Sequence, residues 1–143
     1  NAQKLSIPLK KDTLYNKIIP IRDVSFADIS KVGGKAANFA LLSQIIDQQH
    51  LTLKCPEDAF AIPIYFYHQH LNECGANKII DKLIALEALG TDPRETSILL
   101  DSIQVLIFNH PINPTLIIEV EKWMIDKNYT SFRFRSSTNA EHA

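Results

Sequence analysis

The sequence contains few of the residues that mark specialised classes of protein. Its 143 residues include two cysteines, one tryptophan and four glycines. Cys55 and Cys74 form no CxxC pair, which argues against a disulfide-rich scaffold and a cysteine-based zinc site. Reduced thiols in a cytoplasmic protein fit this pattern best, and one disulfide between the two cysteines stays open as an alternative.

Long apolar runs and an excess of one charge are also missing. No stretch approaches the roughly 20 apolar residues of a membrane-spanning helix, and the first residues lack the pattern of a secretion signal. Fifteen basic and sixteen acidic residues give a net charge of −1. No overall field therefore attracts nucleic acid or a membrane surface, and an anion would need a local cluster of donors.

The hydrophobic content of 45% is sufficient for a folded core. Residues 1–16 are polar and lysine-rich and are predicted to be a flexible lead-in. Residues 17–143 are predicted to be one portion of a domain. A start at Asn1 instead of Met, and a polar run from residue 136 to the end, suggest a piece of a larger domain.

The pattern of apolar residues predicts a helix-rich α+β fold. Apolar segments near Ile18, Ala59 and Phe132 predict a small sheet. Asp92-Pro93 and Asn113-Pro114 each place a capping side chain before a proline, so each predicts the start of a helix. The short connection between these two helices predicts that they form an antiparallel hairpin.

A paired glycine opens the most informative segment, residues 31–46. It continues as a helix with one face predicted to be buried, on which Phe39, Leu42 and Ile46 recur at three- and four-residue intervals. Without a Cβ, Gly33 and Gly34 allow the backbone to turn sharply and to approach another group closely. The first helical turn presents unpaired N–H groups and the positive end of the helix dipole.

Lys35 adds a full positive charge at this helix end. The combination is typical of an anion cradle. The alternative is a simple glycine turn before a core helix, with Lys35 in solvent. A Walker-type phosphate loop does not fit, because its first glycine and its hydroxyl residue are replaced here by Ile29 and Ala36.

The alternating segment 131–135, SFRFR, predicts a strand. Phe132 and Phe134 would face the core of the protein, and Arg133 and Arg135 would face the opposite side of the strand. Three hydroxyl residues follow directly: Ser136, Ser137 and Thr138. Such donors suit phosphate oxygens. The alternative is a solvent-facing strand surface followed by a polar turn.

Three segments follow one another in the chain: VGGKAANFALLSQ (32–44), PEDAFAIP (56–63) and FRFRSSTNAE (132–141). In this order they resemble the nucleotide-binding domain of the pyruvate phosphate dikinase and phosphoenolpyruvate synthase family. Glucan water dikinases share that domain. The resemblance extends from about Pro20 to the last residue. Three ordered motifs are much more specific than any one of them.

The resemblance implies an ATP-grasp-type domain in which ATP phosphorylates a histidine on a separate domain. By this similarity Arg135 would be the catalytic residue that holds the transferring phosphoryl group. The implied ATP-phosphate residues are Gly33, Gly34, Lys35, Arg135, Ser136, Ser137 and Glu141. Mg²⁺ would be a cofactor whose ligands lie beyond residue 143. The phosphohistidine and pyruvate-binding domains of the full-length protein would be partners, and pyruvate, a glucan or another metabolite stays open as the final acceptor.

The chain departs from the family pattern at three places. His142 follows Glu141 where the family usually has Asp, Gln104 stands where an arginine is common, and Arg133 occupies a place that is commonly small and apolar. Gln104 and His142 support an alternative function as a catalytically degenerate, nucleotide-sensing or structural module. We expect the 143 residues alone to bind ATP weakly or not at all.

A second motif, His68 and His70, suggests metal binding at first sight. Residues two apart on a helix point in different directions, and no third ligand is apparent, so no metal site is predicted.

Overall fold

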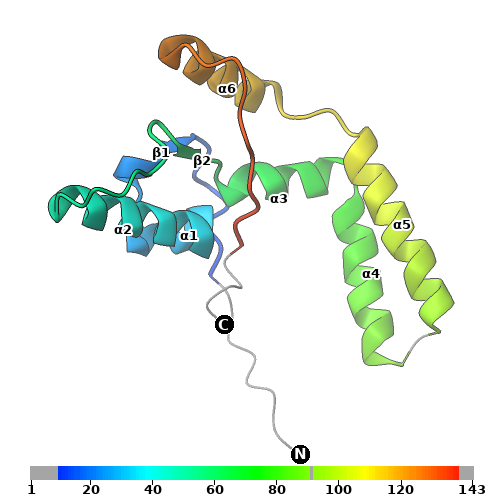
Figure 1. The fold of residues 1–143 in the computed structure, drawn as a ribbon. Coiled ribbons are helices and arrows are strands. Elements are labelled where there is room, and N and C mark those ends of the chain that lie inside the picture. Colours follow the sequence, from blue (N-terminus) through cyan, green and yellow to red (C-terminus); the bar gives the residue numbers. More distant parts are fainter. Residues whose placement is uncertain (1–9, 91, 139–143) are drawn as a thin grey trace, which may run out of the picture. The chain divides into compact units, whose positions relative to one another are not determined.

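The computed structural model describes residues 10–90 and 92–138. Over these residues the protein is helix-rich, with a single two-stranded antiparallel sheet (Figure 1), which confirms the predicted α+β class. The elements in chain order are β1 (Ile19–Pro20), η1 (Ile21–Asp23), η2 (Phe26–Asp28), α1 (Ile29–Val32), α2 (Gly34–Gln48), β2 (Phe60–Ala61), α3 (Ile64–Glu73), α4 (Ala76–Ala88), α5 (Pro93–Asn109) and α6 (Pro114–Lys127).

The described residues divide into two compact units. Unit 1 contains those up to Tyr65 together with those from Ile118 onward, and unit 2 is the continuous segment Phe66–Ile117. Of the predicted lead-in, residues 1–9 lie outside the described part, whereas the backbone N–H of Asp12 donates to the carbonyl of Ser30 at 2.8 Å. None of the described helices combines the length and apolar character needed to cross a membrane.

The core of unit 1 forms where α2 packs against the segment between β1 and α1. Its buried residues are Ile19, Ile21, Val24, Val32, Ala37, Ala40 and Ala61. The inward face of α2 is therefore lined by alanines, which let the neighbouring turns approach closely. Ile46 is buried and Phe39 packs against the core as predicted, but Leu42 is 50% exposed. Its inward orientation was predicted wrongly.

The sheet contains two strands instead of the predicted three. β1 pairs with β2, with Ile19 opposite Ala61 and Pro20 opposite Phe60. Residues 131–135 have no regular secondary structure, and Phe134 is 61% exposed. The predicted strand and the inward orientation of Phe134 are therefore wrong.

An aromatic contact takes the place of the missing strand. The ring of Phe132 lies 5.1 Å from that of Phe60, edge to face, and Trp123 of α6 lies 5.3 Å from the same Phe60 ring. Trp123 also donates from Nε1 to the carbonyl oxygen of Asp58 at 3.0 Å. The side chain of Phe60 is thus covered by rings, while residues 131–135 form no backbone ladder with β2.

The N-terminal part of unit 1 is reinforced by Asp28. Its carboxylate accepts hydrogen bonds from the backbone N–H and the hydroxyl of Ser25 and forms an ion pair with Lys31 at 2.7 Å. The bond from Lys31, followed by those from Ser25, lowers the pKa of Asp28 to about 2. Asp28 in turn raises the pKa of Lys31. The charge of Lys31 is therefore balanced within the fold.

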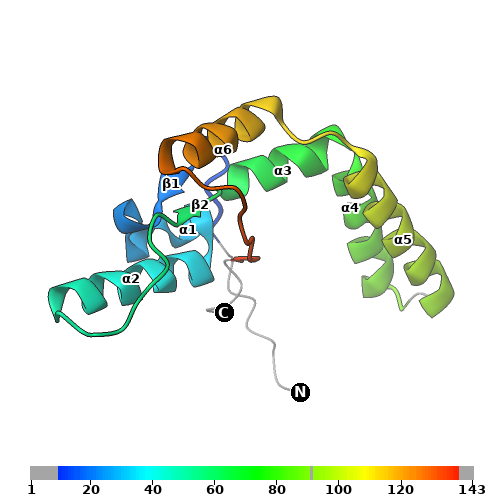
Figure 2. The same cartoon turned by 45° about the horizontal axis from the view of Figure 1, so that its top comes forward.

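Unit 2 contains an antiparallel pair formed by α4 and α5 (Figures 1 and 2). Phe66, Ala76 and Ile103 are its buried apolar residues. The predicted hairpin of α5 with α6 is wrong, because α5 pairs with α4 and most of α6 belongs to unit 1.

Both predicted helix starts in this part of the chain are confirmed. The carboxylate of Asp92 accepts from the backbone N–H of Arg94 at 2.9 Å. The side-chain oxygen of Asn113 accepts from the backbone N–H of Thr115 at 2.8 Å. In each case the following proline is the first residue of the helix, where its missing N–H removes no bond.

Candidate functional site

The glycine motif and the polar segment after residue 135 meet at the N-terminal end of α2. The last described residues run back through unit 1 to this end of α2 (Figures 1 and 2). The backbone N–H of Gly34 donates to the carbonyl of Thr138 at 2.8 Å. The N–H of Ala36 donates to the hydroxyl oxygen of Ser137 at 3.0 Å. Two segments a hundred residues apart are therefore joined by direct hydrogen bonds.

Gly33 is required here for two independent reasons. Its backbone has φ 81° and ψ 167°, a combination that is essentially restricted to glycine. A Cβ at this position would also lie 2.6 Å from the Ser137 hydroxyl and 2.7 and 2.8 Å from the Ser137 carbonyl carbon and oxygen. The sharp turn and close approach expected of this glycine are both present.

The open anion cradle predicted from the sequence is only partly available. Two of its first-turn N–H groups, those of Gly34 and Ala36, are bonded to Thr138 and Ser137. The expectation that they are unpaired was therefore wrong. The sequence did not reveal this because a hydroxyl a hundred residues away caps the helix in place of a local side chain. An anion at this end would be held mainly by side chains.

Lys35 and Arg135 are brought to the same end of α2. Lys35 lies between Gly34 and Ala36, the two residues that bond to the distant segment, and Arg135 precedes Ser137 by two residues. Two residues of chain span at most about 7 Å, so the Cα of Arg135 stays close to that contact. Both side chains are exposed. The backbones of both residues therefore lie near this end of α2.

Of the two remaining predicted site residues, Ser136 is described and Glu141 is not. Ser136 is exposed in the segment that carries Arg135. Glu141 lies outside the described residues, as does His142. Gln104 and Arg133 are exposed, the former on α5 of unit 2 and the latter before the candidate site.

The two histidines of the HxH motif have separate structural partners in unit 2. His70 donates from Nε2 to the carbonyl of Ile107 at 2.9 Å, whereas Nδ1 of His68 accepts from the side chain of Asn72 at 3.2 Å. Across residues 10–90 and 92–138, no group of histidine, cysteine, aspartate and glutamate side chains is arranged to hold a metal ion.

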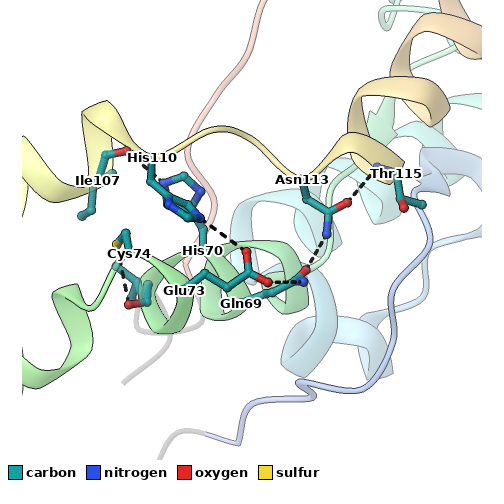
Figure 3. Close-up of polar contacts among 9 residues, drawn as sticks. Gln69, His70, Glu73, Cys74, Ile107, His110, Asn113 and Thr115 are labelled. Atoms are coloured by element: carbon teal, nitrogen blue, oxygen red, sulfur yellow. Dashed lines mark hydrogen bonds and ion pairs between the residues drawn. The ribbon is translucent and has the colours of Figure 1, made fainter.

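Around His70 lies a polar network that the sequence did not predict (Figure 3). The ring of His110 lies 5.0 Å from that of His70, and His110 Nε2 contacts a carboxylate oxygen of Glu73 at 3.4 Å. Gln69 bonds to Glu73 and accepts from Asn113, both at 2.7 Å. The network connects α3 to the residues between α5 and α6, which is a structural role. The spacing of Gln69 and Glu73 was its only sequence signal.

Comparisons of the chain with protein-family models, curated proteins and solved structures found no match. Within unit 1 the segments 32–44, 56–63 and 132–138 contact one another. Segment 32–44 contacts segment 132–141 through Ala36 and Ser137. Segment 56–63 contacts it through Phe60 and Phe132.

Proposed function

We propose that the N-terminal end of α2 and residues 135–138 form the phosphate-contacting part of an ATP-grasp-type, nucleotide-binding domain in a dikinase-type phosphotransferase. The observation that carries this proposal is the pair of hydrogen bonds from Gly34 to Thr138 and from Ala36 to Ser137. These bonds join two of the three motifs on which the family resemblance depends, and they bring the backbones of Lys35 and Arg135 to the same end of α2.

The chemistry of phosphoryl transfer fits this set of donors. Such transfer needs mainly the positioning of phosphates and the neutralisation of spreading negative charge. Lys35 supplies a point charge for the nucleotide phosphates. Arg135 supplies a planar fork that matches the oxygens of a terminal phosphoryl group. In the proposed reaction that group passes to a histidine on another domain and then to pyruvate or another acceptor.

Magnesium would be held by residues other than those described at the site. The segments 33–38 and 135–138 contain no carboxylate, and Mg²⁺ prefers carboxylate and phosphate oxygens. Bound magnesium would neutralise phosphate charge. The residues described here would contribute the cationic donors.

The proposal is tested by ATP binding to the full-length protein, measured by calorimetry with magnesium present. Lys35→Ala and Arg135→Ala should each weaken binding by at least tenfold, since a charge-assisted hydrogen bond is worth about 1.5–3 kcal/mol. Lys54→Ala and Arg22→Ala are matched controls, because they remove exposed cations of unit 1 outside the site. Equal effects of all four substitutions would contradict the proposal.

The same preparations distinguish the alternative function. An active dikinase consumes ATP and forms phosphohistidine, and Arg135→Ala should abolish both. A degenerate sensing module, which the Gln104 and His142 departures favour, would bind ATP without consuming it. Wild-type protein that binds ATP tightly yet forms no phosphohistidine would therefore select the alternative.

A further inference from the structure

Residues 131–138, which we name the strap, have no regular secondary structure and contact the rest of unit 1 at two anchors. At the first anchor the ring of Phe132 packs against those of Phe60, at 5.1 Å, and Tyr129, at 6.1 Å. At the second anchor Ser137 and Thr138 accept hydrogen bonds from α2. The residues between the anchors are exposed: Arg133, Phe134, Arg135 and Ser136.

The two anchors differ in physical character. The Phe132 anchor buries aromatic surface, which water cannot replace. The α2 anchor consists of two hydrogen bonds and the space left by the missing Cβ of Gly33. A hydrogen bond to a partly exposed group exchanges with water at modest net cost. We therefore expect the hydrogen bonds of the α2 anchor to open first, while the Phe132 ring keeps the strap on the rest of unit 1.

We propose that the strap is a latch that assembles and disassembles the candidate phosphate site, with the Ser137 hydroxyl as its positioning group. This inference rests on the proposed function of Lys35 and Arg135. With the α2 anchor closed, Arg135 stays at the end of α2 that carries Lys35. With the anchor open, Arg135 is tethered only through Phe132, three residues away, which allows a displacement of up to roughly 10 Å.

Binding of a polyphosphate and closure of the latch should then reinforce each other. The closed latch holds Arg135 at the end of α2 that carries Lys35, and a polyphosphate bound by both side chains would favour this closed state. Thermodynamic reciprocity requires that a ligand favouring the closed state binds more tightly when closure is favoured. The polyphosphate should thus protect the α2 anchor, and a weakened anchor should lower its affinity.

Hydrogen exchange of the full-length protein, with inorganic tripolyphosphate as the probe, tests both halves of the inference. Ser137→Ala should accelerate exchange at the N–H of Ala36 about fivefold, the value of one net hydrogen bond, without accelerating exchange around Phe60. The same variant should bind tripolyphosphate about fivefold more weakly. Ser137→Thr, which keeps the hydroxyl, should restore both values. Ser131→Ala, an exposed serine at the other end of the strap, is the matched control.

The outcomes separate the latch from the proposed function. If the wild-type protein binds tripolyphosphate and Ser137→Ala changes neither exchange nor affinity, the latch is refuted and the proposed function survives. Faster exchange with unchanged affinity refutes the positioning role of Ser137. If the wild-type protein binds no tripolyphosphate at all, the proposed function fails and the latch fails with it.

Discussion

Gly33→Ala is the substitution that tests the local structure of the site most directly. A residue with a side chain at φ 81° and ψ 167° pays about 1–3 kcal/mol of backbone strain. The added Cβ would also overlap the Ser137 carbonyl carbon and oxygen at 2.7 and 2.8 Å, and such overpacking costs about 1–3 kcal/mol more. We therefore expect a loss of about 2–5 kcal/mol in unfolding free energy, allowing for relaxation of the strap.

Gly75→Ala is the matched control for this experiment. Gly75 also has a positive φ, 77°, but a Cβ there would meet no atom within 4 Å. Gly75→Ala should therefore lower the free energy of unfolding by only about 1–2 kcal/mol, the cost of a side chain in the left-handed backbone conformation. Urea denaturation of both variants measures the difference. Equal losses in the two variants would contradict the cost assigned to Gly33, which comes from its backbone conformation and from its close contact with Ser137.

Two further predictions concern charge and helix capping. The pKa of Asp28 is lowered in the folded protein from 3.8 to about 2, so its stabilisation is present above pH 4 and is lost as the pH falls toward 2. Asp28→Asn should lower the free energy of unfolding by about 1–2 kcal/mol at pH 7 and flatten this acid dependence in denaturation curves. An unchanged dependence on acid pH would contradict the cause assigned to the pKa shift. Asp92→Ala should cost about 1 kcal/mol through loss of the α5 cap, and Asn113→Ala should cost more because Asn113 also donates to Gln69; thermal unfolding that ranks the two in the opposite order would count against the Gln69 contact.

Features encoded by a few adjacent residues were predictable from the sequence. The starts of α5 and α6 follow from a capping side chain beside a proline, and the start of α2 follows from the paired glycine. For α5 and α6 the decisive atoms lie within one turn of helix. Such signals do not depend on the rest of the fold.

Features that depend on distant partners were not predictable in the same way. The connections before and after α5, residues 89–92 and residues 110–113, have equal length, so loop length gave no basis for choosing α4 over α6 as its partner. Alternation in residues 131–135 indicated a period but not a neighbouring strand. β2 is only two residues long, and Phe132 covers Phe60 with its ring.

For the candidate site, the sequence predicted the participants better than their contacts. Gly33 and Ser137 were both identified, yet the capping of Ala36 by Ser137 was not. Hydrogen bonding between two segments that are remote in sequence has no local pattern to reveal it.

The order of the two units along the chain has a consequence for biosynthesis. Unit 2 is one continuous stretch, whereas unit 1 needs residues from both sides of it. During translation the α4–α5 pair has all its residues before α6 leaves the ribosome. We expect it to fold early, since contacts between neighbouring helices close short loops. The ring of Phe60 stays uncovered until Trp123 and Phe132 have been synthesised. We therefore expect a nascent chain paused within unit 2 to expose that aromatic surface to chaperones.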